Sequence, residues 1–357
     1  MKLLLELPIN SLSLGNVSVN LLREIHSRGI DIGLFPIGET DLASYTVDKP
    51  FVDWLQKSIN HRYEFLKKDA VCIRNWHIAG SDLLRTNNQV LLSYHETNKT
   101  SPIETTIVNL QKKTLFCGGY SEGIFREAGC DNVGSFGLGF SPEFHVTGKK
   151  YLSSTHWGLC QKWENRKLTG KIISLWVKKY GNNKDHSLTL LVNNPFFSPE
   201  DNQRLLSQAL ENKRYFNVNI LPRLSTQNEL NEYHNAIDID LGGISPSESW
   251  NIPPFTSTVL GKWSIVTASM GNLGWATEEN SIMIQPCGMR PSHDGVFFKE
   301  GGDYSQGEFY DVSDEEILKS MERAEQKFSQ PNTAGLMLQK THSWKNSLDS
   351  ILEQVYS

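Results

Sequence analysis

The sequence predicts an α/β protein built from two doubly wound halves, each a parallel sheet with helices on its faces. Three observations support this prediction. The 357 residues are too many for one ordinary core and suit two α/β domains of usual size. Strand-like and helix-like segments alternate along both halves. Between the halves, SPEFHVTGKK (residues 141–150) has the composition of a linker, with a proline, a glycine and two lysines.

The first half opens with a strand, a glycine-containing loop, a helix and a second strand. Residues 2–7 are strand-like, and Asn16 to Arg28 predicts a helix that ends at Gly29. The second strand is Ile30 to Phe35. The alternation continues through the strands Val71–Ile73, Val90–Tyr94 and Lys113–Cys117 and the helix Glu122–Ala128.

The second half repeats the pattern. Its expected strands are Tyr151–Cys160, Ser187–Val192, Phe216–Leu221, Ile237–Leu241 and Trp263–Thr267. Its expected helices are Lys171–Tyr180, Pro199–Leu210, Thr226–His234 and Asp314–Lys327, the last with a capping residue at Ser313. We therefore expect domains over residues 1–148 and 149–330, followed by a C-terminal segment, 331–357, with a helix over Trp344–Val355. A cleft between two such halves is where ligands usually bind.

Composition narrows the class of protein. The chain has 38% hydrophobic and 21% charged residues, which is typical of a globular protein and not of a disordered one. With 35 basic and 40 acidic residues, its net charge of −5 argues against a nucleic-acid partner. Five scattered cysteines without a CxxC pair favour reduced, buried thiols over disulfides or a zinc site. The sequence shows neither a secretory signal nor a membrane-spanning stretch, so we expect a cytoplasmic location, with peripheral membrane contact left open.

The loop Ser245 to Phe255 is the most informative segment. It follows the strand-like run AIDIDL and precedes a segment that predicts the start of a helix, so its Glu248 lies at the carboxyl end of a strand. Ligands of open α/β sheets bind at this edge, and a glutamate there suits the hydroxyl groups of a sugar. A solvated loop carboxylate is the alternative. The neighbouring pair Asp238 and Asp240 spells DxD, a possible but less favoured metal site.

A basic segment, Lys162 to Lys167, follows the first strand of the second half and precedes a helix. Lysines at this position suit a phosphate, assisted by the helix N-terminus behind them. An ordinary solvated basic turn would have the same sequence.

Two segments of the first half follow strand ends in the same way. Ser13 to Ser18, with Gly15, lies between the first strand and the first helix, and an ordinary turn explains it equally well. His95 and Glu96 follow the strand Val90–Tyr94, where they could position an acceptor hydroxyl. A histidine with a purely structural role is the alternative.

Together these segments, over roughly residues 2–330, resemble the retaining GT-B glycosyltransferases, often called glycosyl transferases group 1 (family 4-like). The resemblance implies two Rossmann-like domains facing each other across a cleft, with an acceptor site on the first domain and a nucleotide-sugar donor site on the second. It also implies that segment 331–357 packs back on the first domain. One departure stands out. The family has a second glutamate, separated from the first by seven residues, that holds the nucleotide ribose, and Thr256 occupies its position here.

The resemblance assigns roles residue by residue. Lys162 and Lys167 would stabilise the leaving diphosphate, Glu248 would bind the donor sugar, and His95 and Glu96 would lie near the reacting centre. The residues implied in donor binding are Gly15, Asn16, Arg166, Ser245, Asn251, Ile252, Pro253, Phe255 and Thr256. The backbone N–H groups of Phe255, Thr256 and Ser257 would face the diphosphate if a helix begins after Pro254.

The expected function is transfer of a sugar from a nucleotide-sugar to a glycan, lipid or other acceptor, with retention at the anomeric carbon. Neither a metal nor a cofactor is expected, because the nucleotide-sugar is a co-substrate. Two alternatives remain: a degenerate relative that binds a sugar nucleotide or glycan without turnover, suggested by Thr256, and a sugar-nucleotide epimerase or hydrolase of the same architecture. A DNA-modifying glucosyltransferase shares the plan but fits the acidic balance poorly.

Overall fold

The computed structural model describes residues 3–294 and 296–356 and divides the chain into two compact units. The first unit contains the chain up to Ser141, the segment Gly301–Gln306, and the chain from Thr341 onwards. The second contains Pro142–Glu300 and Gly307–Lys340. The sequence analysis did not assign the short segment 301–306 to the first unit, and it expected the division seven residues later, after residue 148.

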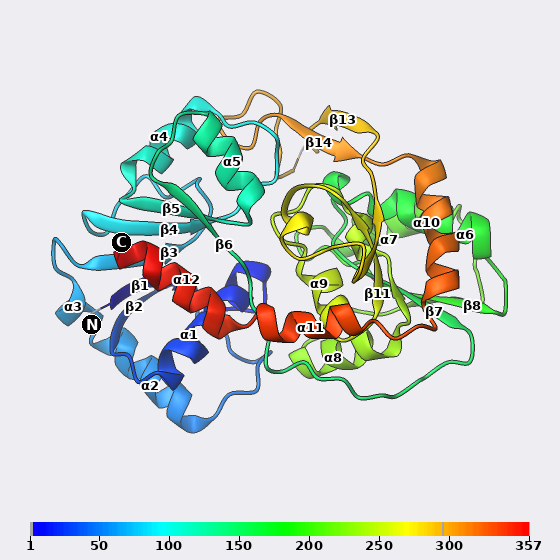
Figure 1. Cartoon of the computed structure of the whole chain (residues 1–357), viewed down its shortest axis with the longest axis horizontal. Coiled ribbons are helices and arrows are strands. Elements are labelled where there is room, and N and C mark those ends of the chain that lie inside the picture. The colour runs from blue at the N-terminus through cyan, green and yellow to red at the C-terminus, as the bar shows by residue number, and fades with distance from the viewer. Residues whose placement is uncertain (1–2, 295, 357) are drawn as a thin grey trace. The chain divides into compact units, whose positions relative to one another are not determined.

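The first unit holds a parallel sheet of six strands in the order β2-β1-β3-β4-β5-β6 (Figure 1). Its strands are β1 (Leu3–Pro8), β2 (Ile32–Ile37), β3 (Val71–Asn75), β4 (Asn88–Ser93), β5 (Lys113–Cys117) and β6 (Val133–Phe136). Its helices are α1 (Ser13–Ser27), α2 (Lys49–Asn60), α3 (Arg62–Phe65), α4 (Pro102–Leu110), α5 (Gly119–Glu127) and α12 (Trp344–Tyr356). β1 is buried at every position, as expected for a strand covered on both faces.

The C-terminal helix α12 packs on α1 and β6 of the first unit (Figure 1). Arg28 bonds Asp349 at 2.6 Å, and Gln354 donates to the Ser135 carbonyl at 2.8 Å. Gly139 lies so close to the start of α12 that a Cβ there would be 2.3 Å from the Trp344 nitrogen. The helix is therefore an integral layer of the first unit.

The segment Gly301–Gln306 is held on α4. Ser101 caps this helix with a full capping box, and its hydroxyl also donates to the Asp303 carbonyl at 2.5 Å. The Ser305 N–H donates to the Glu104 carboxylate at 2.8 Å, and Tyr304 packs on the apolar cluster around Phe116.

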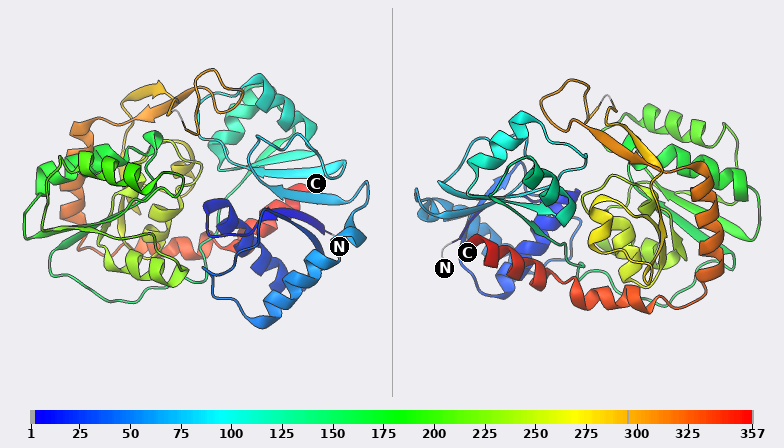
Figure 2. Two further views of the ribbon diagram at one scale, coloured as in Figure 1. Left: turned by 180° about the vertical axis from the view of Figure 1, so that it is seen from behind. Right: turned by 45° about the horizontal axis from the view of Figure 1, so that its top comes forward.

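The second unit holds another six-stranded parallel sheet, in the order β12-β11-β10-β7-β8-β9. Figure 2 shows helices of this unit, coloured green to orange, beside the sheet in two further views. Its strands are β7 (Thr155–Cys160), β8 (His186–Leu191), β9 (Val218–Ile220), β10 (Ile239–Asp240), β11 (Trp263–Thr267) and β12 (Ser281–Ile284). The α-helices of this unit are α6 (Thr169–Tyr180), α7 (Pro199–Ala209), α8 (Gln227–Ala236), α9 (Ile252–Val259), α10 (Asp314–Lys327) and most of α11 (Thr333–Thr341). The short 3-10 helices are η1 (Asn165–Lys167), η2 (Gly242–Ile244) and η3 (Met270–Gly274). A large apolar core joins α6, α7 and α10 to the central strands.

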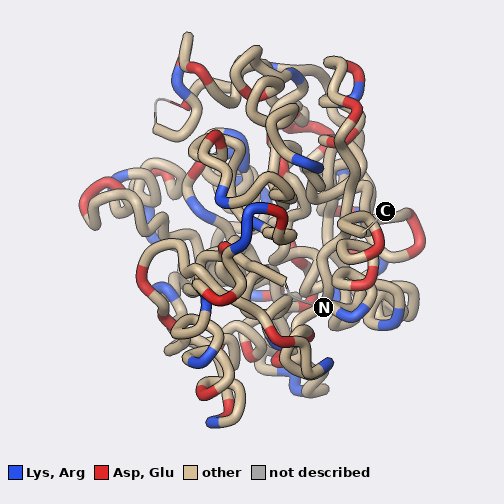
Figure 3. Tube along the Cα trace, turned by 90° about the vertical axis from the view of Figure 1, so that its left-hand side faces the viewer, with Lys and Arg blue, Asp and Glu red and all other residues tan. Residues whose placement is uncertain are grey.

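An antiparallel hairpin, β13 (Gly288–Pro291) and β14 (Glu308–Asp311), extends the second unit between β12 and α10. The sequence analysis did not predict it, since its strands are only four residues long and β13 is mostly exposed. Basic and acidic residues are interspersed along the trace, as Figure 3 shows from one side.

The predicted alternation of strands and helices in two α/β halves is confirmed, although α2, α3, α4, α11, β6 and β12 were not predicted and several predicted elements differ at their ends. The strand expected from Tyr151 begins at Thr155, and that expected over Phe216–Leu221 covers only Val218–Ile220. Thr226 and Ser313 cap α8 and α10 through their hydroxyls. All five cysteines are free, as expected, but Cys287 is exposed and Cys160 is only partly buried.

Gly15 lies inside α1 rather than in a loop, because the helix begins at Ser13. A Cβ at this position would lie 2.2 Å from the Asn10 carbonyl oxygen and 2.4 Å from its side-chain oxygen. The chain's own backbone therefore requires glycine here. This contact accounts for Gly15 without a bound phosphate.

We expect Gly15→Ala to lower the free energy of unfolding by about 1–3 kcal/mol, because Asn10 must move to admit the methyl group. Gly123→Ala is the matched control, since a Cβ in that part of α5 would meet no atom within 4 Å. It should stabilise the protein by about 0.5–1 kcal/mol. Urea unfolding of both variants measures the difference, and equal stabilities would disprove the packing account.

Candidate functional site

The basic segment after β7 forms a tight turn that leads into α6. Gln161 donates to the Lys167 carbonyl and to the Thr169 hydroxyl, both at 3.0 Å, and Thr169 donates back to the Lys162 carbonyl at 2.8 Å. Leu168 takes a left-handed conformation with φ of 57° and no side chain caps α6. These contacts fix Arg166 and Lys167 with their side chains in the interior, at 6% and 8% exposure.

The loop after β10, from Ser245 to Asn251, is buried throughout. Hydrogen bonds to its backbone come from η3 and the residue before it. The Gly271 N–H donates to the Glu248 carbonyl at 2.9 Å, and the Ser269 hydroxyl donates to the Pro246 carbonyl at 2.5 Å. Gly271 is required here, as a Cβ would lie 1.8 Å from the Ser249 carbonyl oxygen. The loop is consequently rigid and presents Glu248 in one orientation.

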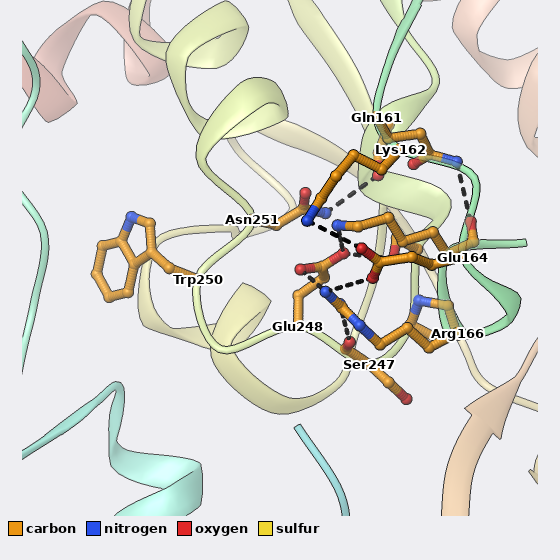
Figure 4. Close-up of polar contacts among 12 residues, drawn as sticks. Gln161, Lys162, Glu164, Arg166, Ser247, Glu248, Trp250 and Asn251 are labelled. Carbon is orange, nitrogen blue, oxygen red and sulfur yellow. Dashed lines mark hydrogen bonds and ion pairs between the residues drawn. The ribbon is translucent and has the colours of Figure 1, made fainter. Parts of the chain in front are cut away.

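Glu248 joins the two loops through ion pairs (Figure 4). One carboxylate oxygen accepts from Lys167 and from the Ser245 hydroxyl, the latter at 2.8 Å. The other oxygen is 2.8 Å from Arg166, which also donates to the Ser247 carbonyl at 2.8 Å. The Trp250 ring points away from this cluster (Figure 4).

A second buried carboxylate, Glu164, completes the cluster. It lies 2.8 Å from Arg166 and 3.0 Å from Lys162, and its side chain is 3% exposed. The sequence analysis missed it, although an acidic residue within the basic run KWENRK was the available signal. The cluster of Lys162, Glu164, Arg166, Lys167 and Glu248, which we call the ion-pair cluster, thus holds three positive and two negative charges.

The cations keep both carboxylates ionised. Burial by itself would raise the pKa of Glu248, but Arg166 and Lys167 outweigh it and lower this pKa to about 2. At Glu164 burial is likewise outweighed, mainly by Arg166, and the pKa falls below its ordinary value. At neutral pH the cluster therefore keeps a net charge of +1.

The helix after the loop begins earlier than expected. α9 starts at Ile252, so the Phe255 N–H donates to the Asn251 carbonyl at 3.3 Å inside the helix. A helix start after Pro254, the condition under which the Phe255, Thr256 and Ser257 amides would face a diphosphate, is therefore not met. Pro253 and Pro254 have no N–H, which leaves the first turn of α9 with few donors.

Thr256 and Phe255 are buried within α9, at 4% and 1% exposure. Phe255 packs edge-on against Trp250 and Trp275, with ring centroids 5.7 Å apart in each pair. Asn251 takes a left-handed conformation with φ of 66° and donates to the Gly242 carbonyl at 3.1 Å. These contacts give the three residues structural roles, and a donor-binding role for them stays a prediction.

Buried polar side chains of α8, β10 and α9 form a chain of hydrogen bonds next to this loop. The Ser257 hydroxyl is 2.5 Å from the Asp240 carboxylate and 2.7 Å from the His234 ring, and Asp240 also accepts from the Gly242 N–H at 2.7 Å. Burial raises the pKa of Asp240 to about 6, although Ser257 and Gly242 oppose the rise. Burial and the Lys262 charge lower the pKa of His234 to about 3. Of the DxD pair, Asp240 thus serves loop structure and Asp238 bonds the His156 N–H at 2.9 Å.

The remaining predicted residues belong to the first unit. His95 is 3% exposed, and its ring contacts the Lys99 carbonyl at 2.9 Å and the Thr97 hydroxyl at 3.0 Å. Burial lowers its pKa despite Glu104, whose carboxylate lies 4.0 Å away. Glu96 is partly buried, and Asn16 accepts from Asn20 at 3.2 Å within α1. The geometry thus gives His95 a satisfied structural environment.

Within the second unit, the structure brings together Lys162, Arg166, Lys167, Ser245 and Glu248, as the sequence predicted for neighbouring strand ends. Among residues 3–294 and 296–356, no three His, Cys, Asp or Glu side chains group as metal ligands would. The same residues include no helix with the length and apolarity to cross a bilayer.

Comparison with known proteins identifies the fold. No family model and no curated protein sequence matches the chain. Among solved structures, a sucrose-phosphate synthase from Thermosynechococcus elongatus matches with a TM-score of 0.69 at 11% identity, covering 99% of this chain and 98% of the other. A glycosyltransferase from Rickettsia africae matches with a TM-score of 0.68 at 11% identity, covering 99% and 97%.

An Anabaena HepE, solved in complex with UDP and glucose, matches with a TM-score of 0.64 at 12% identity, covering 100% of this chain and 98% of the other. The chain shares with these proteins the GT-B fold of two Rossmann-like domains, which confirms the predicted fold class. At these identities the likeness defines the fold, and the activity must be argued from the site.

Asp240 should make stability depend on pH. The pKa of Asp240 in the folded state, about 6, lies above its ordinary value of 3.8. The protonated carboxyl therefore favours the folded state, and the ionised carboxylate disfavours it. Its contribution is lost as pH rises from about 4 to about 6, by at most about 3 kcal/mol. Asp240→Asn should remove this loss, because an amide can accept from Gly242 and donate to Ser257.

Urea unfolding of the wild type and Asp240→Asn between pH 4 and 7.5 tests this prediction. The free energy of unfolding of Asp240→Asn minus that of the wild type should increase as pH rises. A difference that is constant across this range would show that Asp240 is ionised throughout.

Proposed function

We propose that this protein is a retaining glycosyltransferase that transfers a sugar from a nucleotide-sugar donor to a glycan, lipid or other acceptor. One observation carries the proposal: Lys162, Arg166, Lys167 and Glu248 converge at the carboxyl ends of β7 and β10 in a chain with the GT-B fold. This edge of a parallel sheet is where ligands bind. That the two domains face each other across a cleft remains part of the proposal.

The three cations supply the electrostatic component of the reaction. Negative charge develops on the leaving diphosphate in the transition state, and fixed positive groups in a buried site stabilise it strongly. Lys167 and Arg166 are buried and oriented by the turn around Gln161, so little reorganisation is needed. Lys162, with 35% of its side chain exposed, is the most accessible of the three.

Glu248 has the role of binding the donor sugar. Its two oxygens accept from Lys167, Ser245 and Arg166 in this structure. A diphosphate that draws the cations toward itself would release carboxylate lone pairs for sugar hydroxyl groups. Donor binding is then an exchange of partners within the ion-pair cluster, with no charge left unpaired.

The reaction proposed here needs neither a metal nor a cofactor, since protein cations neutralise the leaving group. His95 and Glu96 would lie near the reacting centre, Gly15 and Asn16 would take part in donor binding, and a cytoplasmic location belongs to the same proposal. HepE was solved with UDP-glucose, and a trehalose-6-phosphate protein from E. coli with UDP-2-fluoro glucose. These complexes make UDP-glucose the first donor to test.

A thermal-shift panel of UDP-, GDP-, ADP- and TDP-sugars, with and without EDTA, tests the proposal. A ligand that binds only the folded state at 100 times its Kd stabilises it by about 2.7 kcal/mol. We expect one nucleotide class to raise Tm of the wild type independently of EDTA, and Lys167→Met to abolish the rise. The panel should be followed by measuring release of that nucleotide in the presence of candidate acceptors.

Lys178→Met is the matched control for Lys167→Met, since Lys178 is an exposed lysine of α6 outside the ion-pair cluster. It should respond to the donor as the wild type does. Equal Tm shifts in the wild type and Lys167→Met would contradict the phosphate role of Lys167.

A second candidate function is a glycosyltransferase-like protein that binds a sugar nucleotide or glycan without turnover. A specific observation favours it: buried Glu164 neutralises part of the charge that a diphosphate needs, while α9 contributes few N–H donors. Thr256, buried in α9, also supplies no carboxylate for a ribose.

Removing the charge of Glu164 should reveal how far it weakens phosphate binding. We expect Glu164→Gln to tighten UDP binding by roughly tenfold, because one nearby negative charge is lost while the amide oxygen can still accept from Arg166 or Lys162. Calorimetric titration measures the change. Glu322→Gln on the exposed face of α10 is the control and should leave Kd unchanged. Weaker binding in Glu164→Gln would show that Glu164 instead keeps Arg166 and Lys162 in place.

A further inference from the structure

The second unit has a cavity of about 290 Å³ at the amino ends of β10 and β11. Four segments line it: residues 146–150, the end of α8, the turn between α9 and β11, and the turn between α10 and α11. The ion-pair cluster follows the carboxyl ends of β7 and β10 in the same parallel sheet. The cavity therefore lies at the opposite edge of the sheet from the proposed donor site.

Hydrogen bonds hold the walls of this cavity. The Thr147 N–H donates to the Asn235 side chain at 2.9 Å, and Asn332 donates to the Lys262 carbonyl at 2.8 Å. The Trp263 indole donates to the Gln330 carbonyl at 2.8 Å. Each of the four segments is thus bonded to another, and the cavity is preformed.

Three lysines line the cavity, against one carboxylate. Lys149 lies 3.9 Å from Glu232, whereas Lys262 donates to the Asn235 carbonyl at 2.7 Å. Asp238 also lines the cavity, with one of its oxygens bonded to the His156 N–H.

Lys150 and Lys262 bring like charges together in this cavity. Burial lowers the pKa of Lys262, and Lys150 lowers it further, although Asp238 acts in the opposite direction. Lys262 is partly removed from water whereas Lys150 is exposed, and an anion bound between the two ammonium groups would offset their repulsion.

We propose that this cavity binds the phosphate group of a small phosphorylated polyol. A phosphate dianion matches the pair Lys150 and Lys262 in charge, and lysine is a common phosphate ligand in proteins. The volume exceeds that of a phosphate and is at the lower limit for small-molecule sites. Ser329 and Gln330 supply polar groups for hydroxyls of the ligand. The inference does not depend on the proposed function, since the two sites share no residue.

Calorimetric titration at constant ionic strength, first with inorganic phosphate and then with a hexose 6-phosphate, tests the proposal. We expect the hexose phosphate to bind more tightly than phosphate, and the free hexose not to bind. Equal affinity for both anions would identify free phosphate as the ligand and overturn the polyol part of the proposal. Lys150→Gln and Lys262→Met should each weaken binding about tenfold or more.

Three further variants separate this site from other causes. Lys178→Gln, at an exposed lysine elsewhere on the unit, should leave binding unchanged. Lys167→Met, in the ion-pair cluster, distinguishes binding in this cavity from binding of the anion at the proposed donor site. Asp238→Asn should tighten binding, because it removes the one negative charge of the cavity, and a merely structural role would not produce this result. Loss of binding in Lys167→Met with normal binding in Lys262→Met would place the anion at the ion-pair cluster and overturn the proposal.

Discussion

The buried carboxylate of Glu248 is the constraint on which the geometry of the second unit's site depends. Removing a charge from water costs several kcal/mol, and only well-placed partners offset that cost. Arg166 and Lys167 come from the loop after β7, while Ser245 comes from Glu248's own loop after β10. The two loops must therefore keep their register, and the hydrogen bonds from Gly271 and to Ser247 maintain it. Glu164 adds to this charge balance, because it forms ion pairs with Arg166 and Lys162, whose charges Glu248 leaves partly unmatched.

How much of the fold and of the site could be predicted from the sequence depends on how far apart in the chain the interacting residues lie. The alternation of strands and helices and the positions of Lys162, Lys167 and Glu248 at strand ends were predictable, because they follow from local patterns and from the parallel sheet. The pairing of Glu248 with Arg166 could not be predicted, because it joins residues far apart in the chain and depends on side-chain geometry. The start of α9 was misplaced because two prolines fit the first turn of a helix as well as the loop before it.

Gly15 illustrates a different limit of prediction from the sequence. A glycine between a strand and a helix fits a phosphate loop and also fits a close approach of the chain to itself. Only the position of Asn10 decides between them, and a Cβ at Gly15 would collide with it. His95 is similar, because a histidine at a strand end fits catalysis until its neighbours Lys99 and Thr97 are seen to satisfy its ring. In both cases the structure shows a packing or hydrogen-bonding role that the sequence could not show, and the role in the site stays a prediction.

The first turn of α9 explains why the side-chain cations matter so much here. A helix N-terminus usually binds phosphate through its free N–H groups. In α9, Pro253 and Pro254 remove two of these donors, and Phe255 bonds Asn251 within the helix. An anion at this edge of the sheet would therefore depend on Lys162, Arg166 and Lys167, whose charges the two glutamates already partly neutralise. The balance between three cations and two carboxylates, rather than the fold, decides whether the site holds a nucleotide diphosphate tightly enough to react.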